Sequence, residues 1–189
     1  MTQHNLFGLE MPRMTKNATL SDCRNYRWTL TRDWAEGERI CWVMLNPSDA
    51  DHEVDDPTIR RCIHFTKYWG YAGFTVVNLY PYRSPSPSKC KTWARGQNQA
   101  EAVKLALQQN AAIVAYQARD AGMVVAAWGN NPWDDDLLAS ITESILTERS
   151  DCPEIYCLGT TNSGAPKHPM ARGKHRVPES QMPVLWEKP

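Results

Sequence analysis

The sequence has no surplus of charge of either sign, no long apolar run and no recognisable secretory signal. Among its 189 residues, 21 Lys and Arg residues balance 21 Asp and Glu residues. This balance excludes a generally polycationic surface for nucleic acid, while a local basic patch stays open. The apolar runs fall far short of the roughly 20 residues that a membrane-spanning helix needs. Because the first residues lack the apolar core and the cleavage site of a signal peptide, we expect a cytoplasmic protein without membrane contact.

The six cysteines are scattered and include no Cys-x-x-Cys pair. Zinc and iron–sulfur sites are usually built from two close pairs, and here only Cys152 and Cys157 lie near each other. Without a secretory signal, reduced thiols are favoured over disulfides, so we expect neither a disulfide nor a structural metal. The sequence also lacks a Gly-x-Gly-x-x-Gly, Walker or Gly-x-Ser-x-Gly motif. These absences disfavour dinucleotide binding, P-loop phosphoryl transfer and esterase chemistry, and no cofactor is predicted.

Short apolar runs alternate with helical segments along most of the chain. Residues 26–31 alternate large and polar side chains, which is typical of a strand with one wet face. Four later runs are nearly continuously apolar and predict strands buried on both faces, at residues 40–45, 74–79, 123–128 and 155–158. We therefore expect an α/β fold, a three-layer α/β/α sandwich. Its central sheet is expected to be four-stranded and mainly parallel, with an additional N-terminal antiparallel strand.

Capping residues mark the expected helices. Asp56 is a good N-cap and Pro57 suits the first helical position, which predicts a helix that ends at Gly70. Residues 97–120 are rich in Ala, Gln and Leu and predict a second helix. Pro132 is expected to begin a third helix.

Two segments are predicted to be irregular. The Ser-Pro repeat over residues 84–88 is interpreted as a loop between a strand and a helix. Residues 1–20 are polar and are expected to form an irregular N-terminal arm. The remaining residues, 21–189, are expected to form a single domain.

Polar side chains follow the predicted parallel strands, where ligands bind in this class of fold. Asn46 and Ser48 follow the first of these strands, Asn78 lies at the end of the second, and His168 comes after the fourth. Loop chemistry explains many such residues, because Asn and Ser are common in turns. It explains Asn78 less well, since a buried amide within an apolar strand needs hydrogen-bond partners. For Asn78, a ligand-reading role and a structural role both stay open.

Four segments, in order, resemble motifs of the uracil-DNA glycosylase superfamily. Residues 44–48, Met-Leu-Asn-Pro-Ser, resemble its first motif, and residues 76–79 resemble the strand whose asparagine reads the edge of a base. Residues 125–129 resemble the strand that ends in Trp-Gly, and residues 167–170 resemble the closing His-Pro motif. Within the superfamily, the chain resembles an uncharacterised bacterial and phage family of unknown function, with the opening MLNPSxAD followed by DPTIRR. The likeness covers residues 26–176.

The resemblance implies roles for three groups of residues. In the catalytic group, Asn46 holds the attacking water, His168 donates to the base oxygen that becomes negative, and Asp51 supplies a carboxylate. Asn78 reads a base that has left the stack. The pocket around that base is formed by Pro47, Ser48, Tyr80 and Trp128. The DNA backbone is held by Lys167, Arg172, Lys174, His175 and Arg176. For this last group, a solvated basic tail is the alternative interpretation.

The first motif departs from the superfamily pattern in its asparagine. The fastest uracil enzymes have a carboxylate where this chain has Asn46, and an amide neither acts as a base nor offsets charge on the sugar. A nearby aspartate would have to supply that charge, and the sequence offers Asp49, Asp51, Asp55 and Asp56. Asp56 has a competing role as a helix cap, and we assign the charge to Asp51.

A second departure concerns the size of the base. Ser48 stands where uracil enzymes carry an aromatic residue that shuts out 5-substituted pyrimidines, so we expect a roomier pocket. The closing motif lacks its serine, because Met170 and Ala171 follow the proline. The duplex-wedging loop of the superfamily is therefore left undefined here.

The expected function is that of a monomeric DNA N-glycosylase. It would hydrolyse the N-glycosidic bond of a modified or mismatched base, a 5-substituted pyrimidine rather than uracil, with DNA as its partner. The alternative is a non-catalytic reader of modified DNA, or a protein that binds a free nucleotide on the same fold. The net charge of zero mildly favours this alternative, because duplex-binding proteins usually have a basic surplus.

Overall fold

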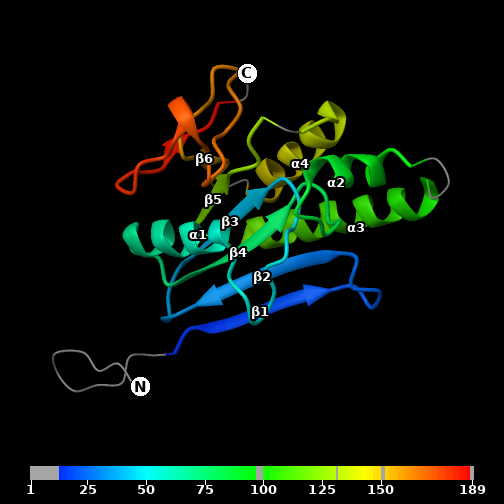
Figure 1. Cartoon of the computed structure of the whole chain (residues 1–189). Coiled ribbons are helices and arrows are strands. Elements are labelled where there is room, and N and C mark those ends of the chain that lie inside the picture. Colours follow the sequence, from blue (N-terminus) through cyan, green and yellow to red (C-terminus); the bar gives the residue numbers. More distant parts are fainter. Residues whose placement is uncertain (1–12, 97–99, 131, 150–151, 188–189) are drawn as a thin grey trace.

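The computed structural model describes residues 13–96, 100–130, 132–149 and 152–187 (Figure 1). Its strands are β1 (Thr15–Leu20), β2 (Arg27–Asp33), β3 (Arg39–Met44), β4 (Gly73–Asn78), β5 (Met123–Ala126), β6 (Tyr156–Cys157) and β7 (Val184–Leu185). Its α-helices are α1 (Pro57–Tyr68), α2 (Pro87–Ala94), α3 (Ala100–Arg119) and α4 (Asp135–Glu148). The described chain is thus an α/β protein with a mixed sheet of seven strands and four helices, and the predicted α/β class is confirmed.

The inner part of the sheet is parallel. The strand order is β1-β2-β4-β3-β5-β6-β7. Strand β3 pairs in parallel with β4 on one side and β5 on the other, and β5 pairs in parallel with β6. Antiparallel strands flank this part, β2 and β1 at one edge and β7 at the other. The expected N-terminal antiparallel strand is β2, while β1 and β7 were not predicted.

The irregular arm predicted for residues 1–20 is wrong in its last part. Residues Thr15–Leu20 form strand β1, which pairs with β2. Exposed and half-buried side chains alternate along β1, and none of them is fully buried. An edge strand of this kind has no apolar run that would reveal it in the sequence. Residues 1–12 lie outside the described part of the chain.

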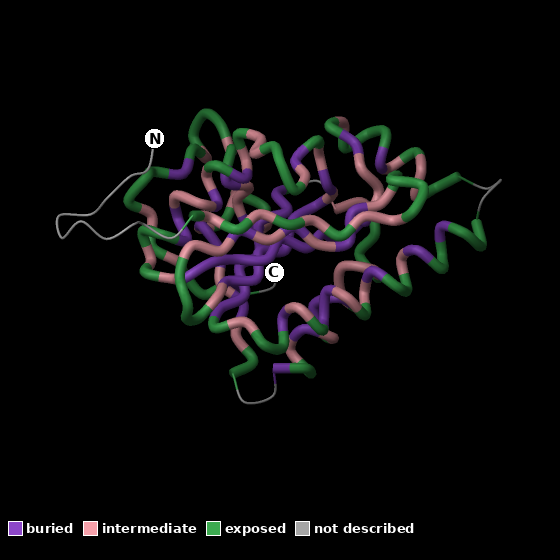
Figure 2. Tube along the Cα trace, turned by 90° about the horizontal axis from the view of Figure 1, so that it is seen from below, coloured by how far each residue is buried: buried purple, intermediate pink, exposed green. Residues whose placement is uncertain are grey.

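Side chains of the central strands alternate between two apolar layers. On β3, Cys41 and Val43 face the layer that contains Ile145 of α4. Ile40 and Trp42 face the opposite layer, to which α1 contributes. The buried residues therefore gather in the central strands, and exposed residues lie on the outer surfaces (Figure 2). Helices on both faces explain why these strands are apolar throughout.

The helices begin close to the predicted caps. The Asp56 carboxylate accepts a hydrogen bond of 2.8 Å from the Ile59 N–H, so α1 begins at Pro57 as predicted. Helix α4 begins three residues later than Pro132 suggests, because the Asp134 side chain caps it. Helix α2 replaces the second half of the loop predicted for residues 84–88, since Pro87 occupies a first-turn position.

A fully buried arginine anchors the loop between β3 and α1. Arg32 of β2 is 0% exposed, and its Nε donates to the Asp55 carboxylate over 2.7 Å. A terminal nitrogen of Arg32 donates to the Asp51 carbonyl over 2.6 Å. Lys16 of β1 also pairs with Asp55. The two antiparallel edge strands therefore fix the segment that precedes α1.

Replacing Arg32 with alanine should strongly destabilise the protein, because it would leave Asp55 and the loop carbonyl without their buried partner. We expect the free energy of unfolding to fall by about 3–5 kcal/mol, measured by urea denaturation. Arg119→Ala is the matched control, because Arg119 pairs with Asp120 on the surface. Its loss should be much smaller, because this pair is exposed to solvent. Equal losses in the two variants would contradict the anchoring role.

Candidate active site

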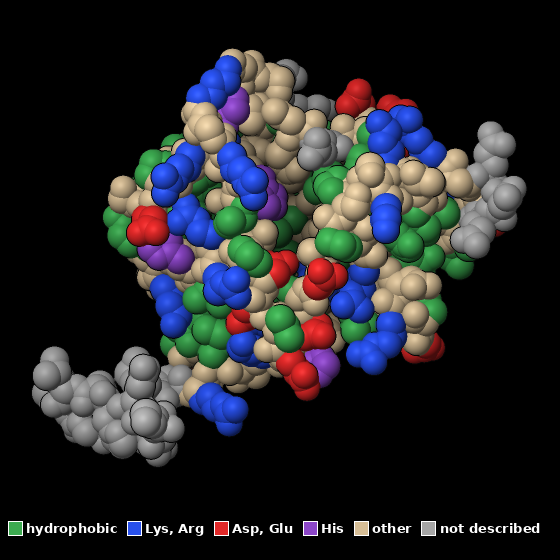
Figure 3. Space-filling model, viewed as in Figure 1, with side chains coloured by type: hydrophobic (Ala, Val, Ile, Leu, Met, Phe, Trp, Pro, Cys, Tyr) green, Lys and Arg blue, Asp and Glu red, His purple; other side chains and the backbone are tan. Residues whose placement is uncertain are grey.

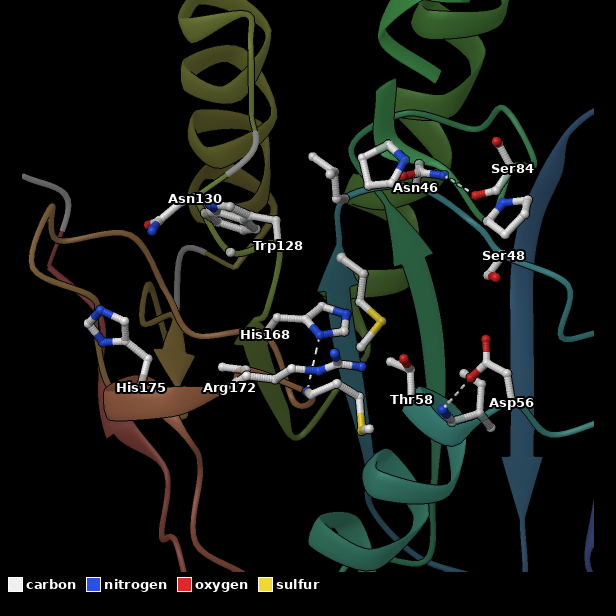
Figure 4. A pocket seen from close by; sticks show the side chains of 18 of the residues that line it. Asn46, Ser48, Asp56, Thr58, Ser84, Trp128, Asn130, His168, Arg172 and His175 are labelled. Atoms are coloured by element: carbon white, nitrogen blue, oxygen red, sulfur yellow. Dashed lines mark hydrogen bonds between the residues drawn. The ribbon is translucent and has the colours of Figure 1, made fainter. Parts of the chain in front are cut away.

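A cavity of about 550 Å³ lies where the parallel strands end (Figures 3 and 4). Its lining comes from the turn after β3, the start of α1, residues 84–87, the turn after β5 and the segment 168–175. Figure 3 shows the hollow near the middle of this face, with Lys and Arg side chains gathered on the side of the C-terminal segment. Six of the predicted site residues line this cavity: Asn46, Ser48, Trp128, His168, Arg172 and His175.

His168 points its imidazole into this cavity (Figure 4). Its Nδ1 lies 3.1 Å from the backbone nitrogen of Met170 and accepts the hydrogen bond of that N–H. In the neutral ring the proton is therefore on Nε2, the nitrogen free to meet a ligand. Removal from water lowers the pKa of His168, and the negative charge of Asp56 opposes this only in part. The ring is thus a neutral N–H donor at neutral pH.

A backbone hydrogen bond links the motif at residues 125–129 to the segment just before the motif at residues 167–170, which contains His168. The Gly129 N–H donates to the Pro166 carbonyl over 3.0 Å. Gly129 has a φ of 72°, which favours glycine, and a Cβ there would lie 3.6 Å from the His168 Cβ. The turn after Trp128 therefore helps to set the position of the imidazole.

Asn46 lines the cavity, and its amide nitrogen is bonded to the backbone. Its Nδ2 donates to the Ser84 carbonyl over 2.8 Å and to the Pro47 carbonyl over 3.1 Å. These bonds use the amide nitrogen and leave Oδ1 as the atom for a ligand or a water. Pro47 itself does not line the cavity and contributes only its carbonyl.

Asp56, and not Asp51, is the carboxylate of the cavity. The Asp51 side chain accepts from the backbone N–H groups of Glu53 and Val54, which lowers its pKa, and it lies outside the cavity lining. Asp55 is engaged by Arg32. Asp56 caps α1 through one oxygen and lines the cavity. Figure 4 shows Asp56 and His168 on different walls.

Arg27 is a cavity residue that the sequence did not reveal. Its side chain is 3% exposed, and its terminal nitrogens donate to the Ala50 carbonyl at 2.8 Å and to the Asn78 Oδ1 at 3.3 Å. Burial lowers the pKa of Arg27 to about 10, which still leaves it charged at neutral pH. An arginine in a strand of alternating pattern looks like a solvent-facing residue, so no local signal marked it.

Asn78 and Tyr80 do not line the cavity. Asn78 is buried behind it, where its Oδ1 holds Arg27 and its backbone carbonyl accepts from Asn110. Tyr80 belongs to the apolar layer that contains Ile145 of α4, and its ring stacks on Trp133 at a centroid distance of 4.0 Å. The chain leaves β4 after Asn78, and Tyr80 therefore turns to the other face of the sheet.

Of the five residues predicted to hold the DNA backbone, three line a cavity and two do not. Arg172 and His175 line the cavity, and Arg176 lines a neighbouring cavity of about 720 Å³ that also contains Arg61. Lys167 lies against the backbone of Gly159, and Lys174 lines neither of these two cavities.

Within the described residues, no group of three or more His, Cys, Asp and Glu side chains is arranged to hold a metal ion. None of the described helices has the length and apolar character to cross a membrane.

Residues 27–170 match a family model described as a protein of unknown function, DUF1643. The chain belongs to the DUF1643 family. No curated protein and no solved structure matches it. The region that matches DUF1643 contains Arg27, Asn46, Asp56 and His168, and it ends before the basic residues that follow Met170. The cavity residues Arg27, Asn46, Asp56 and His168 therefore lie within the DUF1643 region, whereas Arg172 and His175 lie outside it.

The tautomer of His168 can be measured by nitrogen-15 NMR of the imidazoles. We expect the proton on Nε2 at neutral pH and a pKa below the ordinary value of 6.5. As the pH falls below that value, the unfolded chain takes up the proton more readily than the folded one, so this histidine lowers the free energy of unfolding in acid. In His168→Gln this part of the pH dependence should disappear. A proton on Nδ1 would contradict the assignment.

Proposed function

We propose that this DUF1643 protein is a DNA N-glycosidase that releases a modified or mismatched base. The observation that carries the proposal is the neutral His168 ring, held by the Met170 N–H so that Nε2–H faces the cavity. A donor of fixed direction can bond to a base oxygen. That bond strengthens as negative charge develops on the departing base, which is how such a group lowers a barrier.

In the proposed reaction, the bond between C1′ of the sugar and the base nitrogen breaks, and its electron pair leaves with the base. The oxygen of a water forms the new bond to C1′. The Asn46 Oδ1 accepts a hydrogen bond from this water and orients it. One proton of the water passes to the Asp56 carboxylate and then to solvent, and the released base takes up a proton from solvent. The products are a free base and an abasic sugar.

The placement of the motifs supports this proposal. Asn46 follows β3, Trp128 follows β5 and His168 follows β6, and all three line one cavity. The strands that they follow are parallel neighbours. This agrees with the motif order on which the resemblance to uracil-DNA glycosylases rests.

The cavity lining supports a base larger than uracil. Ser48 is small and lines the cavity, and in the motif that resembles the uracil enzymes it stands in place of their aromatic residue. A volume of about 550 Å³ leaves room for a substituent at carbon 5 of a pyrimidine. Arg172 at the same cavity, with Arg176 beside it, supplies positive charge for a DNA phosphate, and His175 adds a ring N–H as a donor.

The proposal is tested by mass-spectrometric detection of free base after incubation with DNA containing uracil, thymine mismatches or 5-substituted pyrimidines. His168→Ala should slow release by about 10²–10³-fold, because one donor to the developing anion is lost. DNA affinity should change little, since it depends mainly on phosphate contacts. The control is His64→Ala, because His64 lies on α1 with its ring against the Glu179 carbonyl. Unchanged release in His168→Ala would contradict the proposal.

A non-catalytic reader is the second candidate, favoured by the amide of Asn46 in place of a carboxylate. DNA binding without release of any base, weakened in Arg172→Ala, would support the reader. Binding of a free nucleotide, without release and without DNA binding, would support a nucleotide-binding protein instead.

A further inference from the structure

The cavity contains a buried positive charge that no carboxylate neutralises at contact distance. Arg27 is 3% exposed, and within the described residues none of the ion pairs includes it. Its two protein partners at the guanidinium ends are neutral oxygens, of Ala50 and Asn78. The negative charge of Asp56 offsets part of the cost of this buried cation from a longer distance. A buried cation without an ion-pair partner is still costly unless an anion contacts it.

Hydrogen-bond donors around Arg27 are also incompletely used. Its Nε has no partner in the described structure, and neither does the Nδ2 of Asn78, the residue bonded to it. Both atoms are buried donors. Such groups are rare in native proteins, and each one calls for an explanation.

Further groups at the cavity also favour negative charge. The N-terminus of α1, a helix of 12 residues, contributes Thr58 and Ile59 to the lining, and the N-terminal end of a helix carries partial positive charge. Arg172 extends beneath His168 (Figure 4). Against these groups stands a single lining carboxylate, that of Asp56, which is already bonded to the backbone of the helix.

We propose that the cavity binds an anionic heterocycle, with Arg27 as the group that stabilises its negative charge and Asn78 as the residue that positions Arg27. In its catalytic meaning this inference rests on the proposed function: the base would leave as an anion, and Arg27 would assist the neutral donor of His168. The binding preference itself does not depend on catalysis. A ligand that brings a negative charge contacts and compensates the buried guanidinium, whereas a neutral ligand of the same shape leaves it with only the partial, longer-range compensation by Asp56.

The test compares two free pyrimidines of similar size by calorimetry. The probes are 5-nitrouracil, at a pH where it is ionised, and thymine, which is neutral at the same pH. The wild-type protein should bind the anion at least about tenfold more tightly, because a bond to a charged group contributes more than one between neutral groups. Equal affinities for the two probes would overturn the proposal.

Two variants identify the residue responsible. Arg27→Gln removes the charge and should reduce the preference to about twofold or less. Asn78→Asp keeps Arg27 but places a carboxylate against it, so it should reduce the preference in the same way. Circular dichroism reports whether each variant folds, and Asn78→Asp keeps the test valid if Arg27→Gln does not fold. An unchanged preference in a folded Asn78→Asp variant would overturn the role of Arg27.

Asn17→Asp is the matched control for the change of charge. Asn17 is exposed on β1, and its side-chain oxygen accepts from the Ala18 N–H, a bond that an aspartate keeps. The anion preference should therefore remain. A reduction as large as that in Asn78→Asp would show that net charge, and not the contact with Arg27, controls binding, which would overturn the proposal.

The two proposals fail in different ways. An anion preference without base release from any DNA would overturn the glycosidase and leave the anion site standing. Base release that depends on His168, without an anion preference, would overturn the anion site and leave the glycosidase standing. Where both hold, Arg27→Gln should slow release of thymine more than release of 5-nitrouracil, because the poorer leaving group needs more stabilisation of its anion.

Discussion

Two buried arginines of β2 hold the loop on which the cavity depends. Arg32 bonds the Asp51 carbonyl and the Asp55 carboxylate, and Arg27 bonds the Ala50 carbonyl. The loop between β3 and α1 ends at the cap of α1, and these bonds hold its middle at Ala50 and Asp51 and its end at Asp55. Fixed backbone carbonyls and a half-buried carboxylate also explain why arginines are tolerated inside the sheet, since a guanidinium presents several donors in a fixed geometry.

The apolar strands of the fold could be predicted from the sequence because burial on both faces leaves a continuous signal. Strands β3, β4 and β5 show it, and Asp56 with Pro57 marks the start of α1. The edges could not be predicted in the same way. Strand β1 has no fully buried residue and β7 has only two residues, both exposed, so tertiary pairing and not local pattern determines them.

The candidate site was predictable where a residue directly follows a parallel strand, as Asn46 and Trp128 do. The choice of carboxylate and the presence of an arginine in the cavity could not be predicted, because they depend on the path of a loop and on a strand from another part of the sheet. The sequence marks Asp56 as a helix cap and therefore favours Asp51 as the carboxylate of the site. The path of the loop instead turns Asp51 to its own backbone and leaves Asp56 at the cavity. Arg27 reaches the cavity from β2, a strand whose sequence pattern indicates a wet face.

The position of the carboxylate affects how the proposed reaction would be driven. A carboxylate that caps a helix has one oxygen occupied by a backbone N–H, so only its other oxygen can act on a water. Asp56 is in this situation, and Asn46 adds no base at the strand end. Weak activation of water shifts the burden to the departing base. A neutral donor at His168 and a buried guanidinium at Arg27 act on that base, and the barrier would then depend more on the stability of the leaving anion than on the strength of the nucleophile.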